Sequence, residues 1–460
     1  MEKERVVIEA EDYVLEITRG LRNPSVEDDR IKVGDLVLEL DVKTSLLGES
    51  LASLLLPPID IDNVKGDAEW FKSLLDRYRL RVISEQAYDL GARSGRLVEV
   101  LEIPLSYMPL SRMSMFKNLY PCIFNKYADE SGLTLLEEEY RDTAERIGIL
   151  FNGRIVIKPA RVKDFLLSMI KSTTMPLSVS AATLTFKPPR KLGECSPREL
   201  LREPWKLLKL PEGRFSLTCK NALELARDVL DGSIECSSPS LISSSIKCSS
   251  NTGVVVVKEY RRMYIKWIPT YIAGYTKYKY RVSPKSRLAA EYHYLRVLRR
   301  ITRTPRIYSV CVEYYTGSMV REYIEGTPVL ESKDKEDWRL AGETLAEIHN
   351  KGITLGDPNP GNFLVTHEDK PAIIDAEQAR PATLHGMAWD LGVLAIYSLI
   401  MNKDKALVEE AFKGYKSKAN RAEETLKLLG KDRFWAQFML LPHIISKIKT
   451  IATTTLNTQI

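Results

Sequence analysis

The sequence lacks the apolar segments that direct chains to membranes. Its first residues, MEKERVVIEAEDY, are charged, so a secretory signal is not expected. No window reaches the roughly eighteen uncharged apolar residues of a membrane helix. The best apolar run, residues 387–401, is shorter and contains Asp390. We therefore predict a buried core helix there, no membrane partner and a cytoplasmic location.

Closely spaced cysteines and N-terminal histidines are also missing. The six cysteines contain no C-x-x-C pair, the spacing typical of zinc ligands. In a cytoplasmic chain this pattern predicts reduced, structural cysteines. All five histidines follow residue 290, so the N-terminal half has no histidine base or ligand. We find no motif that carries chemistry in that half.

The length of 460 residues predicts two or three domains. The clearest shift in composition is the serine-rich segment 236–250, preceded by an amphipathic helical pattern and followed by the β-branched run GVVVVKEY. We place a boundary near residue 235. Residues 1–235 mix strand patterns, at 5–20 and 35–42, with helical patterns at 66–91 and 133–151, which predicts an α/β or α+β domain. The remainder divides into residues 236–326 and 327–460, and the whole chain is of the α+β class.

Three polar residues gather around a predicted hairpin in the C-terminal half. Two apolar stretches, 363–365 and 372–374, flank the turn THEDKP, so Asn362 and Asp375 should lie at the same end. Asp357 precedes a proline-rich loop that cannot be helical. Amide and carboxylate oxygens suit Mg²⁺, and a further carboxylate suits the attacking hydroxyl in phosphoryl transfer. The alternative for Asp357 and Asn362 is a pair of turn-stabilising side chains.

The pattern D-x-x-x-x-N followed by I-I-D resembles the catalytic loop and metal-binding segment of protein-kinase-like enzymes. GDPNPGNFLV is similar to aminoglycoside phosphotransferases and ubiquinone-biosynthesis kinase-like sequences, and IIDAEQA is similar to RIO kinases. Leu355 departs from the kinase pattern, which has histidine there, and Ala376-Glu377 replaces Phe-Gly. MAWDLG resembles the buried kinase helix whose aspartate, here Asp390, hydrogen-bonds the catalytic loop.

The resemblance implies a bilobal, minimal protein-kinase-like fold, with an N-lobe at 236–326 and a reduced C-lobe at 327–460. Asp375 and Asp390 are only fifteen residues apart, which leaves no room for a long activation segment. This reduced plan is that of RIO-type and aminoglycoside-type kinases.

The resemblance also implies a nucleotide lobe upstream of the hairpin. A strand ending in Lys258 would supply the lysine for the α- and β-phosphates, although Lys266 is a rival. Glu291, on a helix that begins near Ser283, would pair with this lysine. The segment with Glu322 and Tyr323 resembles the hinge of RIO-like kinases and of the small kinase of the tRNA threonylcarbamoylation complex. There the backbone would meet the adenine.

The loop over the phosphates is the least defined part of this lobe. Kinases place glycines there, whereas the candidate here is Ser243-Ser244-Ser245, whose hydroxyls could substitute. An ordinary linker is the alternative.

Basic residues crowd the same lobe. Residues 258–306 contain fourteen lysines and arginines and only two acids, interleaved with aromatic residues. Such a surface could contact RNA or a ribonucleoprotein, or an acidic protein, or it could simply be solvated.

The expected function is an ATP- and Mg²⁺-dependent kinase, most closely an atypical serine/threonine protein kinase that phosphorylates a protein or itself. The expected catalytic residues are Asp357, Lys258 and Glu291. Nucleotide would be bound by Lys258, Glu322, Tyr323, Asn362 and Asp375, with Asn362 and Asp375 on the metal. Two alternatives stay open: a small-molecule phosphotransferase, and an ATPase-type switch or scaffold bound to RNA.

Overall fold

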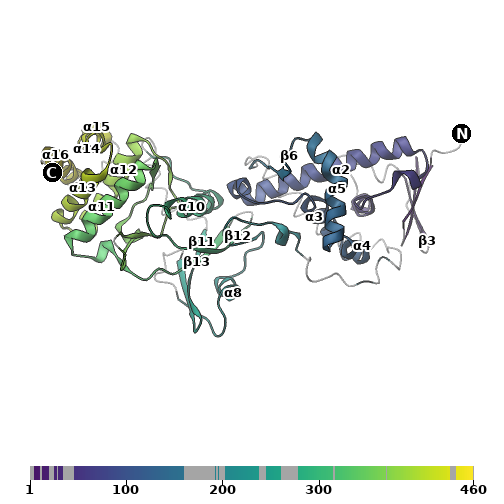
Figure 1. Ribbon diagram of the computed structural model, residues 1–460, viewed down its shortest axis with the longest axis horizontal. Helices are drawn as coiled ribbons and strands as arrows, with labels where there is room; N and C mark the ends of the chain where they lie inside the picture. The colour runs from purple at the N-terminus through teal and green to yellow at the C-terminus, as the bar shows by residue number, and fades with distance from the viewer. Residues whose placement is uncertain are drawn as a thin grey trace. The chain divides into compact units, whose positions relative to one another are not determined.

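The computed structural model describes most of the chain, and its mixed helix and strand content confirms a chain of mixed α and β structure. The described residues are 5–10, 13–19, 25–27, 30–34, 46–159, 192, 195, 203–237, 245–260, 278–313, 316–368, 370–435 and 442–458. They form two compact units, Met1–Leu217 and Thr218–Ile460, labelled along the chain in Figure 1.

The first unit contains a small sheet in the order β3-β4-β2-β1-β5. Its strands are β1 (Arg5–Glu9), β2 (Val14–Thr18), β3 (Ser25–Glu27), β4 (Arg30–Gly34) and β5 (Lys65–Gly66). Alternate residues of β1 are buried, as expected of a strand with one face on a core. The strands predicted at the start of the chain are thus confirmed for β1 and β2. A further predicted strand at residues 35–42 lies outside the described residues.

Helices make up most of the rest of this unit. They are α1 (Leu46–Ala52), α2 (Ala68–Ser94), α3 (Tyr107–Met115), α4 (Pro121–Lys126) and α5 (Glu130–Arg146), with short 3-10 turns η1 (Ser53–Leu55), η2 (Ile61–Asn63), η3 (Gly95–Glu99) and η5 (Pro204–Leu207). The long helical patterns predicted around α2 and α5 are confirmed. Short strands complete the unit: β6 (Leu150–Phe151), β7 (Arg154–Ile155) and β8 (Arg214–Ser216).

The second unit begins with an antiparallel sheet whose strands run in the order β12-β13-β11-β10-β9. They are β9 (Glu235–Ser237), β10 (Ser245–Ser250), β11 (Gly253–Tyr260), β12 (Ile307–Val312) and β13 (Gly317–Glu322). Two segments of similar sequence, SIECSS at 233–238 and SIKCSS at 245–250, contain the paired strands β9 and β10, with Cys236 opposite Cys248. Two helices belong to this part, α8 (Ala222–Arg227) and α10 (Pro284–Leu298), and α8 packs on the sheet through Leu225 and Ala226.

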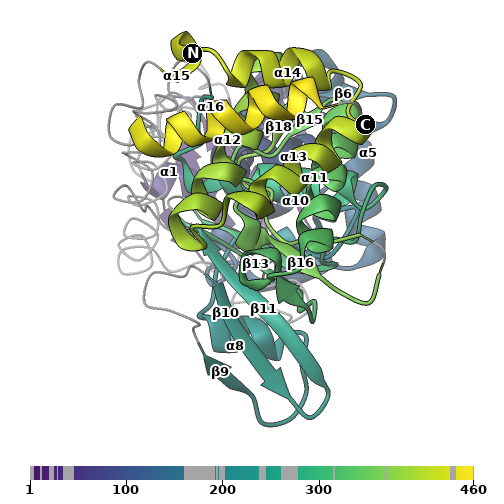
Figure 2. The same cartoon turned by 90° about the vertical axis from the view of Figure 1, so that its left-hand side faces the viewer.

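Helices form the remainder of the second unit. They are α11 (Lys335–Asn350), α12 (Leu384–Met401), α13 (Lys405–Lys418), α14 (Ala422–Leu429), α15 (Asp432–Trp435) and α16 (Pro442–Asn457). Figure 2 shows these helices at one end of the unit and the β9–β10–β11 edge with α8 at the other. Short pieces lie between them: β14 (Thr327–Pro328), η6 (Val329–Glu331), β15 (Ile353–Thr354), η7 (Pro360–Asn362), β16 (Phe363–Val365), β17 (Ala372–Ile373) and β18 (Arg380–Pro381).

The predicted core helix at 387–401 lies within α12. Among the described helices, α12 alone is long and apolar enough to cross a membrane, and 67% of it is buried inside the unit. It contacts α13, α14 and α16. Packing against three helices accounts for its apolar composition, because a helix that is apolar on all sides can be buried in a core.

Two expectations need correction. The cysteines are not reduced single side chains: all six form disulfides, Cys122–Cys195, Cys219–Cys311 and Cys236–Cys248. Two of the pairs join residues 73 and 92 positions apart, which only the fold brings together, and the third joins the neighbouring strands β9 and β10. The second compact unit also begins at Thr218 rather than near residue 235, because α8 and Cys219 belong to the core of the sheet.

Candidate functional site

Lys258 lies near the end of β11, and its side chain is almost fully buried. The run Val254–Val257 has the β-branched composition of a buried strand. Its neighbour β13 fixes the register, with Lys258 opposite Met319. The ammonium contacts three carboxylates: Glu291 at 2.6 Å, Asp375 at 2.8 Å and Glu377 at 3.3 Å. The predicted pairing of Lys258 with Glu291 is confirmed.

Glu291 projects from α10, which begins after Ser283 with Pro284 in its first turn, as predicted. Its side chain is fully buried, with 0% exposed. Besides Lys258, it accepts hydrogen bonds from Arg321 Nη1 at 2.5 Å and Tyr260 Oη at 2.6 Å. Three donors therefore hold this carboxylate, which offsets the cost of burying its charge.

Opposing effects set the protonation of this cluster. Burial tends to lower the pKa of Lys258, but Asp375, Glu291 and Glu377 raise it above its ordinary value. Burial alone would raise the pKa of Asp375, but the charge and hydrogen bond of Lys258 and the Glu377 amide lower it to about 2. At neutral pH, therefore, Lys258 is an ammonium and Asp375 is a carboxylate.

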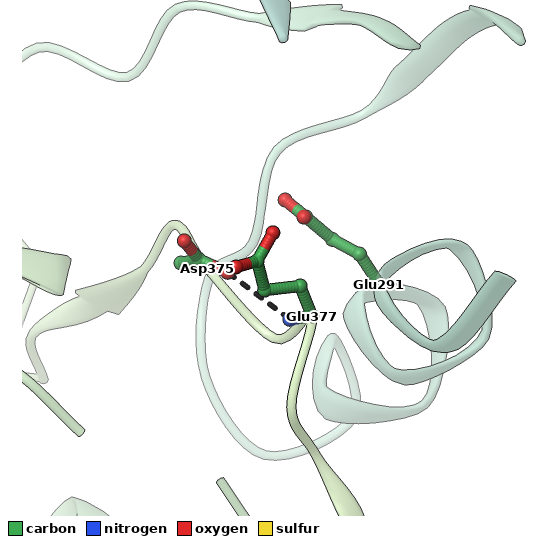
Figure 3. Close-up of side chains that lie close together, drawn as sticks. All are labelled: Glu291, Asp375 and Glu377. Atoms are coloured by element: carbon green, nitrogen blue, oxygen red, sulfur yellow. Dashed lines mark hydrogen bonds between the residues drawn. The ribbon is translucent and has the colours of Figure 1, made fainter. Parts of the chain in front are cut away.

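Asp375 and Glu377 follow the hairpin of β16 and β17. Phe363 pairs with Ile373, and the Ile374 amide then donates to the carbonyl of Asn362 at 3.1 Å. The hairpin thus places Asn362 beside the residue that precedes Asp375, as predicted. The Glu377 amide donates to Asp375 Oδ1 at 3.0 Å. Figure 3 shows this bond, with the carboxylates of Asp375 and Glu377 near that of Glu291.

Asp357 follows a backbone segment that Asp390 of α12 holds in place. Asp390 accepts hydrogen bonds from the amides of Leu355 at 2.7 Å and Gly356 at 2.8 Å. His349 lies 3.0 Å from the same carboxylate. The predicted contact between Asp390 and the loop is confirmed. Gly356 has φ +76°, and an added Cβ would lie 2.3 Å from the Tyr278 ring, so only glycine fits here.

Residues 278–281, just before α10, pack on the same loop. Tyr280 Oη donates to the carbonyl of Gly356 at 2.8 Å, and the indole of Trp389 donates to the same carbonyl at 3.1 Å. Gln378 makes a two-way contact with Arg281, accepting from its amide at 2.7 Å and donating to its carbonyl at 3.0 Å. The loop before Asp357 and the turn after Asp375 are therefore held by one short segment.

The donor set around Asp375 fits a hard cation. Asp375 is partly exposed, at 26%, and Asn362, also partly exposed, uses its amide nitrogen toward the Asp357 carbonyl at 3.5 Å, which leaves its amide oxygen as an acceptor. One carboxylate and one amide oxygen suit Mg²⁺. Glu291, Asp375 and Glu377 also cluster, but three cations, Lys258, Arg287 and Arg321, already pair with that group.

The predicted hinge residues lie at the end of β13. Glu322 accepts from Arg303 Nη2 at 3.2 Å and from the Arg306 amide at 3.1 Å. The ring of Tyr323 lies 4.1 Å from Lys247 Nζ. Lys266, Ser243 and Ser244 lie outside the described residues, as do residues 261–277 of the basic stretch.

Sequence reasoning missed four members of the cluster: Tyr260, Arg287, Arg321 and Glu377. Arg287 and Glu377 are buried and 3.4 Å apart. Arg287 lies one helical turn before Glu291, a spacing that places both side chains on one face of α10. That spacing could have indicated Arg287. Arg321 could not be found in this way, because its place depends on the pairing of β11 with β13.

The same geometry brings six predicted residues into one part of the unit by direct or shared contacts: Lys258, Glu291, Asp375, Asn362, Asp357 and Asp390. Compared with known proteins, the chain matches no family model and no curated sequence, so its function must be inferred from these contacts.

Proposed function

We propose that the second unit is an ATP- and Mg²⁺-dependent phosphotransferase that acts on serine or threonine hydroxyls of a protein, itself included. The sheet β9–β13 with α10 would be the nucleotide lobe of a bilobal, protein-kinase-like arrangement, and α11–α16 the other lobe. The observation that carries the proposal is the position of Lys258, which contacts Glu291 of α10 and Asp375 of the hairpin at once.

Each polar group has a role that follows from its contacts. Lys258 is a buried cation at the edge of a partly exposed site, suited to phosphate oxygens. Glu291 cannot move freely because Arg321 and Tyr260 also hold it, so it orients the lysine. When bound, Mg²⁺ would neutralise phosphate charge, with Asn362 and Asp375 as its protein ligands.

Asp357 would receive the acceptor hydroxyl. Asp357 follows Gly356, whose backbone is fixed by Asp390 and Tyr280, so the point from which its side chain extends is set before any substrate arrives. A carboxylate held in place within reach of a hydroxyl can orient it and accept its proton during transfer. The adenine would lie against the backbone near Glu322 and Tyr323, at the end of β13.

The test is transfer of labelled phosphate from ATP-Mg²⁺ to the protein itself and to a generic serine-rich acceptor. We expect labelled protein from the wild type and about 10²–10⁴-fold less from Asp357→Ala, the usual range for a lost acid–base group. Asp432→Ala is the matched control, because Asp432 is a 91% exposed carboxylate in an ion pair with Lys449. Full transfer by Asp357→Ala would refute the assigned role, and ATP hydrolysis without labelled product would indicate an ATPase.

A further inference from the structure

Three protein carboxylates surround the Lys258 ammonium. Glu291 and Asp375 each accept a hydrogen bond from Nζ, at 2.6 and 2.8 Å, and Glu377 forms an ion pair with Nζ at 3.3 Å. An ammonium has three donors, so a phosphate oxygen that approaches Lys258 must compete with these carboxylates. The affinity of the site for phosphate then depends on how easily one of these carboxylates moves away from Lys258 Nζ.

Glu291 and Asp375 are each held by other donors. Glu291 is bound by Arg321 and Tyr260, at 2.5 and 2.6 Å, in a fully buried position. Asp375 accepts from the Glu377 amide at 3.0 Å and contacts Lys258 at 2.8 Å. Because charge-assisted hydrogen bonds of this length are the strong ones, removal of either carboxylate would cost the most.

Glu377 is the carboxylate that can leave. Its contact with Lys258 is the longest of the three, at 3.3 Å, and both of its oxygens already lie 3.4 Å from Arg287 Nη1. Arg287 is 3% exposed and sits one turn before Glu291 on α10. A small movement of Glu377 toward Arg287 would keep its charge paired while it opens one side of the Lys258 ammonium to a phosphate oxygen.

We propose that Glu377 competes with phosphate groups for Lys258, and that Arg287 is the alternative partner that takes Glu377 when a polyphosphate binds. This inference rests on the proposed function, since it concerns the phosphate affinity of the same nucleotide site. It assigns the control of that affinity to Glu377 and Arg287, which are not among the proposed catalytic residues.

The experiment compares four proteins by isothermal titration calorimetry: wild type, Glu377→Gln, Arg287→Met and the double variant. ATP-Mg²⁺ and inorganic tripolyphosphate are the probes, and thermal melting confirms that each variant is folded. We expect Glu377→Gln to bind both probes about tenfold more tightly, as for removal of one charge-assisted competitor. Arg287→Met should bind them several-fold more weakly, because Glu377 then keeps only Lys258.

The double variant shows whether the tighter binding expected of Glu377→Gln comes from Lys258 or from Arg287. If competition for Lys258 is the cause, the double variant binds as tightly as Glu377→Gln. If the gain vanishes in the double variant, Arg287 itself attracts the phosphate once Glu377 is removed, and the proposal is overturned. Glu368→Gln, an exposed carboxylate paired with Arg303, should change nothing.

The remaining outcomes distinguish this inference from the proposed function. Equal affinities of the wild type and Glu377→Gln would overturn the competition and leave the phosphotransferase intact. A gain of tripolyphosphate binding without any ATP binding would support the competition and count against the nucleotide site. Absence of binding by all four proteins would refute both.

Discussion

Each unit buries a cluster of charges, and the two clusters are built differently. In the first unit, Arg81 and Arg112 each contact both Glu49 and Glu85, and all four residues lie on helices α1, α2 and α3. In the second unit, Lys258 comes from a strand and Glu291 from a helix, whereas Asp375 and Glu377 come from the turn after a hairpin.

The difference shows that buried charge alone does not indicate a reactive site. In the first unit, two cations meet two anions between helices, and such a set fixes how the helices pack. Near Lys258, two of the three anions sit on a turn that also adjoins Asn362 and the loop of Asp357. Side chains on turns can respond to a ligand without unpacking a helix, so the second cluster is the one suited to chemistry.

Arg112→Ala should produce the largest effect and test the structural role of the first cluster. Arg112 is 2% exposed, and its loss would leave Glu49 and Glu85 with one cation between them. We expect the first unit to lose about 3–5 kcal/mol of its free energy of unfolding, the usual cost of breaking a buried pair. Hydrogen exchange of peptides from residues 68–115, followed by mass spectrometry, measures this loss.

Arg96→Ala is the matched control for that experiment. Arg96 is 65% exposed and lies 3.6 Å from Glu99, so its removal should cost less than about 1 kcal/mol. If hydrogen exchange were equal in Arg112→Ala and Arg96→Ala, the buried charge cluster would not stabilise the first unit. The structural role that distinguishes it from the cluster around Lys258 would then be wrong.

Lys258→Met should affect activity instead. Removal of one preorganised positive group from a phosphoryl-transfer site typically costs about 10²–10³-fold in rate. We therefore expect labelled-phosphate transfer to fall by that factor. Arg112→Met, which removes a buried cation from the other cluster, should leave transfer per folded molecule unchanged. If Lys258→Met transferred phosphate at the wild-type rate, the phosphate-binding role would have to belong to another lysine.

The core of this site could be predicted because its parts have local signals. The β-branched run before Lys258 indicated a strand, and Ser283-Pro284 indicated the start of the helix that carries Glu291. Two short apolar stretches and a polar turn indicated the hairpin that places Asn362 near Asp375. Each signal lies within about twenty residues of the side chain that it positions.

The remaining contacts depend on tertiary structure. Arg321 reaches Glu291 because Arg321 lies opposite Val256 in the pairing of β11 with β13. No local sequence pattern predicts this register. The disulfide Cys219–Cys311 joins residues 92 positions apart, and nothing near either cysteine signals the other. The sequence marks Glu377 only as a departure from Phe-Gly, because its partner Arg287 lies 90 residues earlier.

Asp375→Asn should show a smaller effect that depends on pH. The lowered pKa of Asp375, about 2, means that its carboxylate stabilises the folded state above its unfolded pKa of 3.8, and that this contribution is lost as the pH falls through about 2. We expect the variant to lose about 2 kcal/mol at pH 7 and to match the wild type near pH 2. Urea denaturation across this range measures the difference.

Lys258, the basic partner of Asp375, sets the alkaline side of the dependence of stability on pH. The pKa of Lys258 is raised, so its contribution is fully present below its unfolded pKa of 10.5 and is lost only as the pH rises through the higher folded value. Burial raises the pKa of Glu291, and the charge of Asp375 raises it further, so the difference between wild type and Asp375→Asn should change where Glu291 titrates. Above that pH and up to pH 9 the difference should stay constant, and a change there would place another titrating group in control of the cluster.

The smallest effects should come from the helix caps, and they test whether the two units are stabilised separately. Asp129 caps α5 by accepting from the Gly132 amide at 2.9 Å, and Asp334 caps α11 by accepting from the Glu336 amide at 2.9 Å. Each Asp→Ala change should cost about 1 kcal/mol in its own unit. Hydrogen exchange should then rise in α5 peptides for one variant and in α11 peptides for the other. If either change altered exchange in both units equally, the units would unfold together, and a charge cluster in one could influence the other.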